Sequence, residues 1–399
     1  MGGTLSSMTA TRRLIILGST GSIGANTLEV VEHLAATGGP RFEVVALVAG
    51  RNAEVLLEQA QRHRPRAIGL ADGDRDLDAS GLDAAVHRGP DAALEIVERF
   101  AEPGDVVMGA MVGAAGIEPT LAAIRKGCRI ALANKETLVA AGEIVITEAA
   151  AHGAEILPVD SEHSALFQAM RSGEAREIRR VVLTASGGPF RTWPIERLRN
   201  ATIADALAHP TWSMGRKVTI DSASLMNKAL EVIEARWLFD LPADHIEAIV
   251  HPQSVVHGFA EFVDGSVIAQ LSPPDMKMPI QIALTHPERV DGCADRLDWT
   301  TLRGLEFEPV DHERFPALGL ARRVIELGGS AGAVFNAANE IAVGAFLDGR
   351  IPFLRIPELA AEALDALPPQ PLRSLDDVVA ADAAARTWAE EQVATVAGR

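Results

Sequence analysis

Two acidic residues, Asp160 and Glu162, have the clearest potential for chemistry in this sequence. They follow the mostly apolar residues 156–159, an order that predicts the end of a buried strand. If the strand persists to Glu162, side chains two positions apart point to the same face. Two carboxylates on one face repel each other, which favours protonation of one or recruitment of a cation. Oxygen ligands without Cys or His suit Mg²⁺ or Mn²⁺, whereas the plainer interpretation is a solvated loop with two surface acids.

A second group of reactive side chains lies in residues 219–238, whose apolar spacing predicts one helix. Three residues are able to cap it: Asp221, Ser222 and Ser224. Asn227, Lys228 and Glu231 fall together on the side opposite the apolar stripe. An amide, an ammonium and a carboxylate one turn apart can bind a phosphate and complete a metal site. The alternative is a Lys–Glu pair on a solvated face, worth only a few tenths of a kcal/mol.

A glycine-rich loop connects a predicted strand to a predicted helix near the N-terminus. Residues 14–17 are apolar, Gly18-Ser19-Thr20-Gly21-Ser22-Ile23-Gly24 follows, and helical spacing begins at residues 27–31. The glycines permit a tight turn and close backbone approach, and the helix N-terminus offers free N–H groups to a phosphate. The spacing is one residue wider at the front than the usual fingerprint, but the strand-loop-helix context favours a dinucleotide site.

The next predicted strand, residues 43–48, leads to Gly50, Arg51 and Asn52. An NAD enzyme often has an acid here that binds the ribose 2′-hydroxyl. A guanidinium suits a 2′-phosphate instead. The sequence therefore predicts NADP(H) rather than NAD(H); the alternative is an exposed arginine without a ligand.

Polar residues also follow the predicted strand 129–133. Asn134, Lys135 and Glu136 come directly after it, and a helical pattern begins at residue 137. Ligands of open parallel sheets bind at the carboxyl ends of strands, so a cofactor or substrate is expected here. The alternative is an ordinary helix start, because Asn caps helices and Glu suits the first turn; both roles can hold together.

Two loops in the middle of the chain have the composition of binding elements. The turn Ser186-Gly187-Gly188 follows the predicted strand 179–183 and can present hydroxyl and N–H groups to an anion. The stretch from His209 to Gly215 contains Trp212 and Met214 between Pro and Gly, which is typical of a lid. A packed loop without a lid function is the alternative.

Composition limits the functions that the chain can have. It has 399 residues, 48% of them hydrophobic, which is enough for two or three domains with sizeable cores. The formal net charge of −17 argues against a nucleic-acid partner and favours a cytoplasmic protein, and neither a membrane span nor a signal peptide is expected. Two distant cysteines imply no disulfide framework, and the absence of tyrosine excludes a Tyr-x-x-x-Lys proton donor.

The pattern predicts an α/β protein with an N-terminal Rossmann-like parallel sheet, a central α+β catalytic domain and a C-terminal helical bundle. The expected boundaries are a disordered tail at 1–12, an NADPH-binding domain at 13–160, a catalytic and dimerisation domain at 161–295, a linker at 296–311 and a helical domain at 312–399. The central domain would contain the lid at 209–215. It would also contain a hairpin, because Asp264-Gly265 separates two strand patterns.

Six separated motifs together resemble the 1-deoxy-D-xylulose 5-phosphate reductoisomerase family of the non-mevalonate isoprenoid pathway. They are the glycine loop, Ala133-Asn134-Lys135-Glu136, Pro158-Val159-Asp160-Ser161-Glu162-His163, Ser186-Gly187-Gly188-Pro189-Phe190, the stretch 209–215, and Asp221 to Lys228 with Glu231. Phe335-Asn336-Ala337-Ala338-Asn339-Glu340 fits the same pattern. The resemblance begins at Leu14 and continues over essentially the whole chain.

The resemblance implies a role for each matching residue. NADPH would be held by Thr20, Gly21, Ser22, Ile23, Gly50, Arg51, Asn52, Asn134, Glu136 and Gly215. One Mg²⁺ or Mn²⁺ would be bound by Asp160, Glu162 and Glu231. The substrate phosphate would be held by Ser186, Ser222, Asn227 and Lys228, with His209 beside it. Lys135 and Ser161 would contact the substrate's other oxygens, and Trp212 and Met214 would close over it. The family often has lysine at the position of Arg51. Both residues carry a positive charge, so the expectation of a 2′-phosphate contact is unchanged.

The implied reaction is the isomerisation and reduction of 1-deoxy-D-xylulose 5-phosphate to 2-C-methyl-D-erythritol 4-phosphate by a homodimer, without a nucleic-acid or membrane partner. Three candidates for the proton-transferring base stay open: Lys135, Glu162 and a hydroxide on the metal. A metal-independent NADP-dependent dehydrogenase and a non-catalytic NADPH sensor are the alternative functions. The first would turn over fully in excess EDTA, and the second would not consume NADPH.

Overall fold

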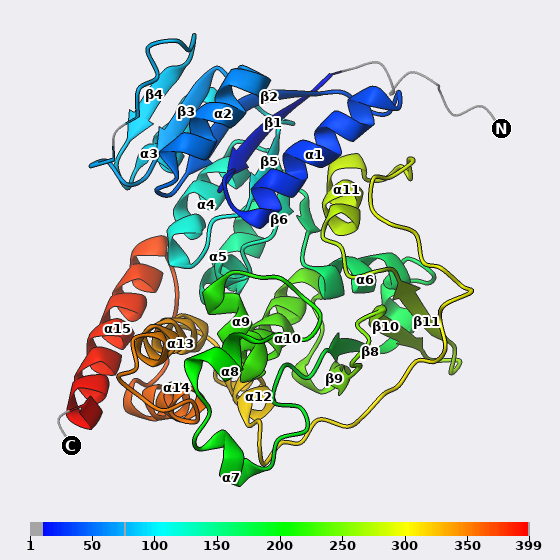
Figure 1. Cartoon of the computed structure of the whole chain (residues 1–399), viewed down its shortest axis with the longest axis vertical. Helices are drawn as coiled ribbons and strands as arrows, with labels where there is room; N and C mark the ends of the chain where they lie inside the picture. Colours follow the sequence, from blue (N-terminus) through cyan, green and yellow to red (C-terminus); the bar gives the residue numbers. More distant parts are fainter. Residues whose placement is uncertain (1–10, 76, 398–399) are drawn as a thin grey trace. The chain divides into compact units, whose positions relative to one another are not determined.

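The computed structural model describes residues 11–75 and 77–397, so nearly all of the predicted tail lies outside the described residues. The chain forms two compact units (Figure 1). One comprises Met1–Thr137, Val145–Ser164 and Asp275–Asp295, and the other comprises Leu138–Ile144, Ala165–Pro274 and Arg296–Arg399. These units differ from the predicted domain boundaries: residues 275–295 pack with the first unit, and the C-terminal helices share the second unit with the central sheet.

Within the described ranges, the first unit is built on a parallel seven-stranded sheet of order β4-β3-β2-β1-β5-β6-β7. The strands are β1 (Arg12–Leu17), β2 (Phe42–Ala49), β3 (Ala67–Leu70), β4 (Ala85–Arg88), β5 (Val106–Gly109), β6 (Arg129–Leu132) and β7 (Ile156–Pro158). The helices are α1 (Ser22–Ala36), α2 (Ala53–His63), α3 (Ala92–Phe100), η1 (Ala114–Gly116), α4 (Ile117–Arg125) and α11 (Lys277–Thr285). The four residues from Leu14 to Leu17 are fully buried, as parallel strands covered on both faces require.

Three of the passages of the chain between the two units lie inside helices. Helix α5 (Glu136–His152) leaves helical geometry at Ala141, where φ is −130° and ψ is 20°. Its central turn, Leu138–Ile144, belongs to the second unit, while both of its ends belong to the first. Helix α6 (Ser161–Met170) begins in the first unit and ends in the second.

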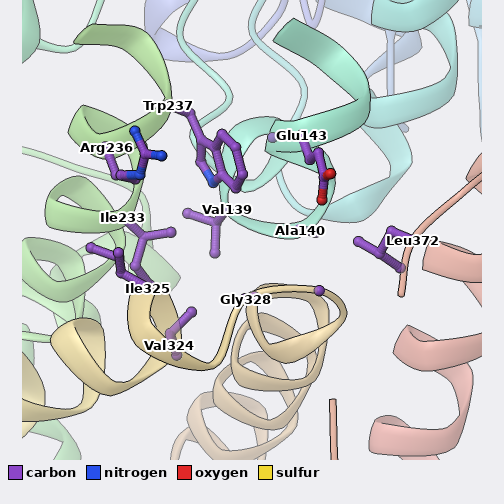
Figure 2. Close-up of a pocket in the computed structure, with 13 residues that line it drawn as sticks. Val139, Ala140, Glu143, Ile233, Arg236, Trp237, Val324, Ile325, Gly328 and Leu372 are labelled. Atoms are coloured by element: carbon purple, nitrogen blue, oxygen red, sulfur yellow. The ribbon is translucent and has the colours of Figure 1, made fainter. Parts of the chain in front are cut away.

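Glycines allow close packing around the kinked turn of α5. A Cβ on Gly142 would lie 2.3 Å from the Trp237 ring, and a Cβ on Gly332 would lie 1.9 Å from the Val139 carbonyl oxygen. A cavity of about 340 Å³ adjoins this turn. Figure 2 shows its lining, which includes Val139, Glu143, Ile233, Arg236, Trp237, Val324, Ile325 and Leu372. None of the predicted site residues lines this cavity.

The second unit contains a four-stranded sheet of order β11-β10-β8-β9, again within the described ranges. Its strands are β8 (Ile178–Ala185), β9 (Ile246–Val250), β10 (Val256–Phe262) and β11 (Val267–Leu271). Strands β10 and β11 form the predicted antiparallel hairpin, in which Gly265 has a φ of +86°. The neighbouring helices are η2 (Ala175–Glu177), α7 (Ile195–Leu198), α8 (Ile203–Leu207), α9 (Arg216–Ala223), α10 (Met226–Phe239) and η3 (Ala243–His245).

Four helices, drawn from golden yellow to red in Figure 1, complete the second unit. They are α12 (Ala317–Leu327), α13 (Ala331–Leu347), α14 (Arg355–Ala366) and α15 (Leu375–Ala397), as the sequence pattern predicts. Helix α13 is the central one, because it packs against α12, α14 and α15 as well as α9 and α10. The predicted fold class is confirmed. Among the described residues, no helix is both long and apolar enough to cross a membrane.

The predicted buried strand before Asp160 is present as β7, but it does not persist to Glu162. Strand β7 ends at Pro158, and α6 begins at Ser161, so Glu162 lies in the first turn of a helix. The Ser164 N–H already donates to the Asp160 carbonyl at 2.8 Å. The two acids therefore come from a strand-to-helix turn, and the argument from alternating strand faces does not apply.

The helix predicted within residues 219–238 is present from Met226 onward as α10, but the residues before Ser224 belong to a second helix, α9, and not to a cap. Helices α9 and α10 are separate, and Leu225 between them has a left-handed backbone with a φ of +58°. Asp221 and Ser222 lie inside α9 and do not cap α10, which has no side-chain cap. Ser224 also does not cap α10, because its hydroxyl donates back to the Ile220 carbonyl at 3.0 Å. The chain therefore makes a corner at the point where the candidate phosphate-binding residues lie.

Candidate functional site

The glycine loop between β1 and α1 is shaped by close backbone contacts. Gly18 has a φ of +96°, and a Cβ there would lie 2.4 Å from the Ala110 carbonyl oxygen, just after β5. A Cβ on Gly24 would lie 2.4 Å from the Gly18 carbonyl oxygen. Strands β1 and β5 are neighbours where the strand order reverses, which is where open α/β sheets bind nucleotides. The loop therefore has the geometry of a dinucleotide cradle.

The exposed part of this loop leads into the first turn of α1. Gly21 is the N-cap of α1, and no side chain caps the helix. Gly21 and Ser22 are exposed, while Thr20 and Ile23 are half-buried. Free N–H groups in a first helical turn favour an anion such as a pyrophosphate.

The predicted 2′-phosphate residues follow β2. Gly50 and Arg51 are exposed. Asn52 caps α2, since its side chain accepts a hydrogen bond from the Val55 N–H at 3.3 Å. Arg51 follows the carboxyl end of β2, where its exposed side chain is accessible to a phosphate.

Asn134 is buried, and its side-chain amide binds groups of the protein itself. It is 2% exposed, and its amide donates to the carbonyls of Met111 at 2.7 Å and Gly113 at 3.1 Å. It also donates to Glu136 at 2.9 Å. Asn134 therefore holds the loop after β5 against the loop after β6. Residues 110–113 were not among the predicted site residues, although their position directly after a strand was a signal that could have identified them.

Lys135 and Asp160 form an ion pair within the first unit. The Lys135 ammonium lies 2.5 Å from the Asp160 carboxylate, and the two side chains are 12% and 14% exposed. The Ser161 hydroxyl donates to the neighbouring Glu162 carboxylate. The predicted residues after β6 and β7 thus meet at adjacent strand ends, which gives a cluster of two carboxylates, a hydroxyl and an ammonium.

Helix α10 contributes a second charged cluster within the second unit. The Glu231 carboxylate accepts from both the Asn227 amide and the Lys228 ammonium, as their spacing predicts. The Lys228 and Glu231 side chains are only 4% and 1% exposed. The interpretation of this group as a solvated Lys–Glu pair is therefore wrong. Burying an ion pair costs several kcal/mol of desolvation free energy per ion. This cost favours a functional role for the pair over a purely structural one.

Ser186 and His209, 23 positions apart, lie together in the second unit. The His209 Nδ1 accepts from the N–H groups of Thr211 at 3.2 Å and Trp212 at 2.9 Å. The ring proton of neutral His209 therefore sits on Nε2, which lies 3.0 Å from the Ser186 Oγ and donates to it. Burial of the ring lowers the pKa of His209 and favours this neutral form.

The Ser186 hydroxyl has its own proton left for a ligand. Its oxygen accepts from His209 and from the Gly188 N–H at 3.1 Å. Both lone pairs are thus engaged, so the hydroxyl proton is directed elsewhere. A cavity of about 340 Å³ opens beside it, lined in part by Pro189, Asp205 and Pro210. This arrangement suits donation to an anion.

The turn that carries Ser186 packs directly on the end of α9. Gly188 has a φ of +64°, and a Cβ there would lie 3.0 Å from the Ser222 carbonyl oxygen. No larger residue fits without moving the turn away from Ser222. The turn and the α9–α10 corner are therefore one assembly, which brings the half-buried Ser222 and Asn227 into the region of Ser186.

The predicted lid, residues 209–215, has neither helix nor strand. Trp212 and Met214 are half-buried, and Gly215 is exposed. The Trp212 ring packs edge-on against His257 of β10, with 6.2 Å between ring centroids. Trp212 thus contacts His257 with its ring and donates its N–H to His209, which is compatible with a movable segment.

We expect His209 to make the protein less stable in mild acid. Because burial lowers its pKa when folded, the unfolded chain binds more protons between the two pKa values, and stability falls as pH drops through that window. Melting temperatures of the wild type and His209→Gln, measured at pH 7.5 and 5.5, check this. The melting temperature of the variant should fall less between pH 7.5 and pH 5.5 than that of the wild type. An identical loss in both proteins would contradict it.

The comparison with known proteins covers nearly the whole chain. Residues 14–142 match the family described as 1-deoxy-D-xylulose 5-phosphate reductoisomerase, and residues 156–239 and 271–388 match two C-terminal domains of that enzyme. The reductoisomerase of Rhodospirillum centenum is 51% identical over 97% of this chain and 95% of the relative. The chain belongs to the 1-deoxy-D-xylulose 5-phosphate reductoisomerase family. The reductoisomerase of Geobacter metallireducens is 49% identical over 96% of this chain and 98% of the relative.

Solved reductoisomerase structures have the same fold. The enzyme from Zymomonas mobilis in complex with NADPH is 44% identical and superposes with a TM-score of 0.88, covering 96% of this chain and 99% of that one. A reductoisomerase in complex with NADPH, fosmidomycin and magnesium is 38% identical, also with a TM-score of 0.88, over 96% and 98% of the two chains. Membership of the reductoisomerase family makes the chain an enzyme, so the non-catalytic alternative is wrong.

Proposed function

We propose that the chain converts 1-deoxy-D-xylulose 5-phosphate to 2-C-methyl-D-erythritol 4-phosphate with NADPH and one divalent metal ion, in the non-mevalonate isoprenoid pathway. Membership of the reductoisomerase family over almost the full length is the observation that carries this proposal. The negative formal charge of −17 and two free cysteines fit a cytoplasmic, reducing location. The buried Cys128 is also unreactive, because burial raises the pKa of its thiol to about 12.

The metal ligands in this proposal are Asp160, Glu162 and Glu231. Carboxylate oxygens are the ligands that Mg²⁺ and Mn²⁺ prefer, and all three proposed ligands are carboxylates. Asp160 is 14% exposed and Glu231 fully buried, so water screens the charge of neither carboxylate well, and their attraction for a cation is stronger than at an open surface. When bound, the metal stabilises negative charge on the substrate's oxygens, and NADPH supplies the hydride.

The substrate phosphate would be bound by the assembly of the Ser186 turn and the α9–α10 corner. Ser186 donates its hydroxyl proton, while Ser222, Asn227 and Lys228 supply further donors. Neutral His209 orients Ser186 and adds no positive charge, so Lys228 is the cation of this group. Phosphate binding far from the reacting carbons provides energy for closing the lid over the substrate.

Among the three candidate bases, the ion pair disfavours Lys135. A carboxylate at 2.5 Å stabilises the protonated ammonium and so opposes its use as a proton acceptor. Lys135 would instead donate hydrogen bonds to the substrate's oxygens, together with Ser161. Glu162, which already accepts from Ser161, is then the protein side chain best suited to hold a moving proton.

The test of this function is NADPH oxidation at 340 nm with 1-deoxy-D-xylulose 5-phosphate. We expect substrate-dependent oxidation with Mg²⁺ or Mn²⁺ and at least about 100-fold less after EDTA treatment, because the metal stabilises charge in the transition state. Adding excess metal back should restore the rate. Full turnover in EDTA would favour a metal-independent dehydrogenase, and no substrate-dependent oxidation under any condition would refute the proposed reaction.

We further propose a homodimer formed through the central sheet. Strand β11 lies at the sheet edge and exposes Val267 (54%) and Ile268 (36%), with Val263 (68%) beside the hairpin. Exposed apolar edge strands are typical places for strand pairing with a second copy. Val267→Lys should shift the sedimentation coefficient from dimer towards monomer, whereas Val379→Lys, at an equally exposed valine on α15, should not. A wild-type monomer at micromolar concentration would contradict the dimer.

A further inference from the structure

We infer that Asn339 is a positioning residue that holds the phosphate-binding end of α9 in place through Asp221. The Asn339 amide donates to the Asp221 carboxylate at 2.9 Å, a contact between residues 118 positions apart. Both residues are buried, at 0% and 1% exposure. This inference rests on the proposed function, because it assigns Ser222 to the substrate phosphate.

Burial makes this hydrogen bond important for the position of α9. Asn339 lies in the middle of α13, among small apolar side chains, where an amide is unfavourable without a partner. Its Oδ1 has no hydrogen-bond partner among the described residues, so the contact to Asp221 accounts for its presence. Asp221 in turn has Lys217 at 3.1 Å on its other carboxylate oxygen. The Asp221 carboxylate is therefore fixed from two helices, α9 itself and α13.

Asp221 is directly followed by the residues that form the proposed phosphate site. Ser222 is the next residue, and Gly188 packs against its carbonyl group. The left-handed turn at Leu225 then leads to Asn227 and Lys228. A shift of the last turn of α9 would therefore move Ser222 and the turn that carries Ser186. Asn339 touches none of the reacting groups and acts only through this chain of contacts.

The same helix provides a matched control. Asn336 lies about one turn earlier in α13 and is also 0% exposed, but its amide donates to Glu340 of the same helix at 3.2 Å. Replacing either asparagine with leucine removes one buried amide from α13. Only the change at Asn339 removes a hydrogen bond to α9. The difference in substrate KM between the two variants therefore separates the positioning of α9 from a general loss of stability.

Steady-state kinetics of the full-length enzyme test the inference. We expect Asn339→Leu to raise KM for 1-deoxy-D-xylulose 5-phosphate about 10-fold to 100-fold, because small displacements of binding groups have large effects. KM for NADPH should change less than twofold. Asn336→Leu should leave both KM values within about twofold. The double variant Asp221→Asn/Asn339→Asp, which restores the bond in the opposite direction, should recover most of the lost substrate affinity.

Amide hydrogen exchange provides a readout that does not depend on turnover. Exchange at residues 219–225 should be faster in Asn339→Leu than in Asn336→Leu, measured without substrate. If the wild type lacks activity, the proposed function fails while this result still tests the contact. Equal KM values for the two leucine variants would overturn the positioning role. If Asn339→Leu does not fold, Asp221→Ala takes its place, because it removes the oxygen that accepts from Asn339, and an unchanged substrate KM in that variant would overturn the role equally.

Discussion

Glu231→Gln should abolish metal-dependent turnover while NADPH binding survives. We expect kcat to fall by about 1,000-fold or more, because the change would remove one of the three proposed anionic ligands from a site that would stabilise developing charge. The affinity for Mg²⁺ or Mn²⁺, measured by titration of activity and of bound metal, should fall in parallel. The NADPH dissociation constant, measured by fluorescence, should stay within about twofold, since the glycine loop and Arg51 belong to the other compact unit.

A purely structural role for Glu231 gives a different result, and the chain offers a way to separate the two. Lys228 is 4% exposed and loses its charged partner in Glu231→Gln, which costs about 3–5 kcal/mol when one member of a buried pair is removed. The double variant Lys228→Met/Glu231→Gln removes both charges and should regain most of that stability in thermal unfolding. It should not regain activity. A stable variant with unchanged metal affinity would count against Glu231 as a ligand.

Arg51→Ala should weaken NADPH binding far more than NADH binding. A charge-assisted bond between a guanidinium and a phosphate is worth about 1.5–3 kcal/mol, so KM for NADPH should rise roughly 10-fold to 100-fold. NADH lacks the 2′-phosphate, and its KM should hardly change. The ratio of kcat/KM for the two cofactors, measured with one enzyme preparation, is the quantity to follow.

The matched control for this variant is Arg41→Ala. Arg41 is also exposed, but it precedes β2, whereas Arg51 follows it, so the two lie at opposite ends of the same strand. Only the carboxyl end of a parallel sheet faces the nucleotide. Arg41→Ala should leave both KM values unchanged. An equal loss of affinity for NADPH and NADH in Arg51→Ala would show that the guanidinium does not recognise the 2′-phosphate.

Elements with a strong local pattern were predictable from the amino-acid sequence. The strand, glycine loop and helix over residues 14–31 were identified from apolar runs and the places where only glycine fits. The hairpin at Asp264-Gly265 and the four C-terminal helices followed from turn residues and a 3.6-residue period. These signals are local, because neighbouring residues along the chain determine them.

Predictions failed where backbone geometry depends on distant packing. The pattern over residues 219–238 fits one helix, yet Leu225 adopts a left-handed conformation that its own side chain disfavours. Helix α9 packs against α8 and α13, and α10 packs against α12 and α13, so partners from distant parts of the sequence surround both helices. Likewise, the apolar run before Asp160 does not show where β7 ends and α6 begins.

Sequence motifs alone determined the family, and they predicted the chemical types at the site: carboxylates for a cation, hydroxyls and lysine for a phosphate, and an arginine for a 2′-phosphate. Only the tertiary structure decided how those groups are held. It assigned the proton of His209 to Nε2, buried the Lys228–Glu231 pair, and joined Asn339 to Asp221 across 118 positions. The physical reason is that residue types are local properties, whereas burial and hydrogen-bond partners arise only when distant segments pack together.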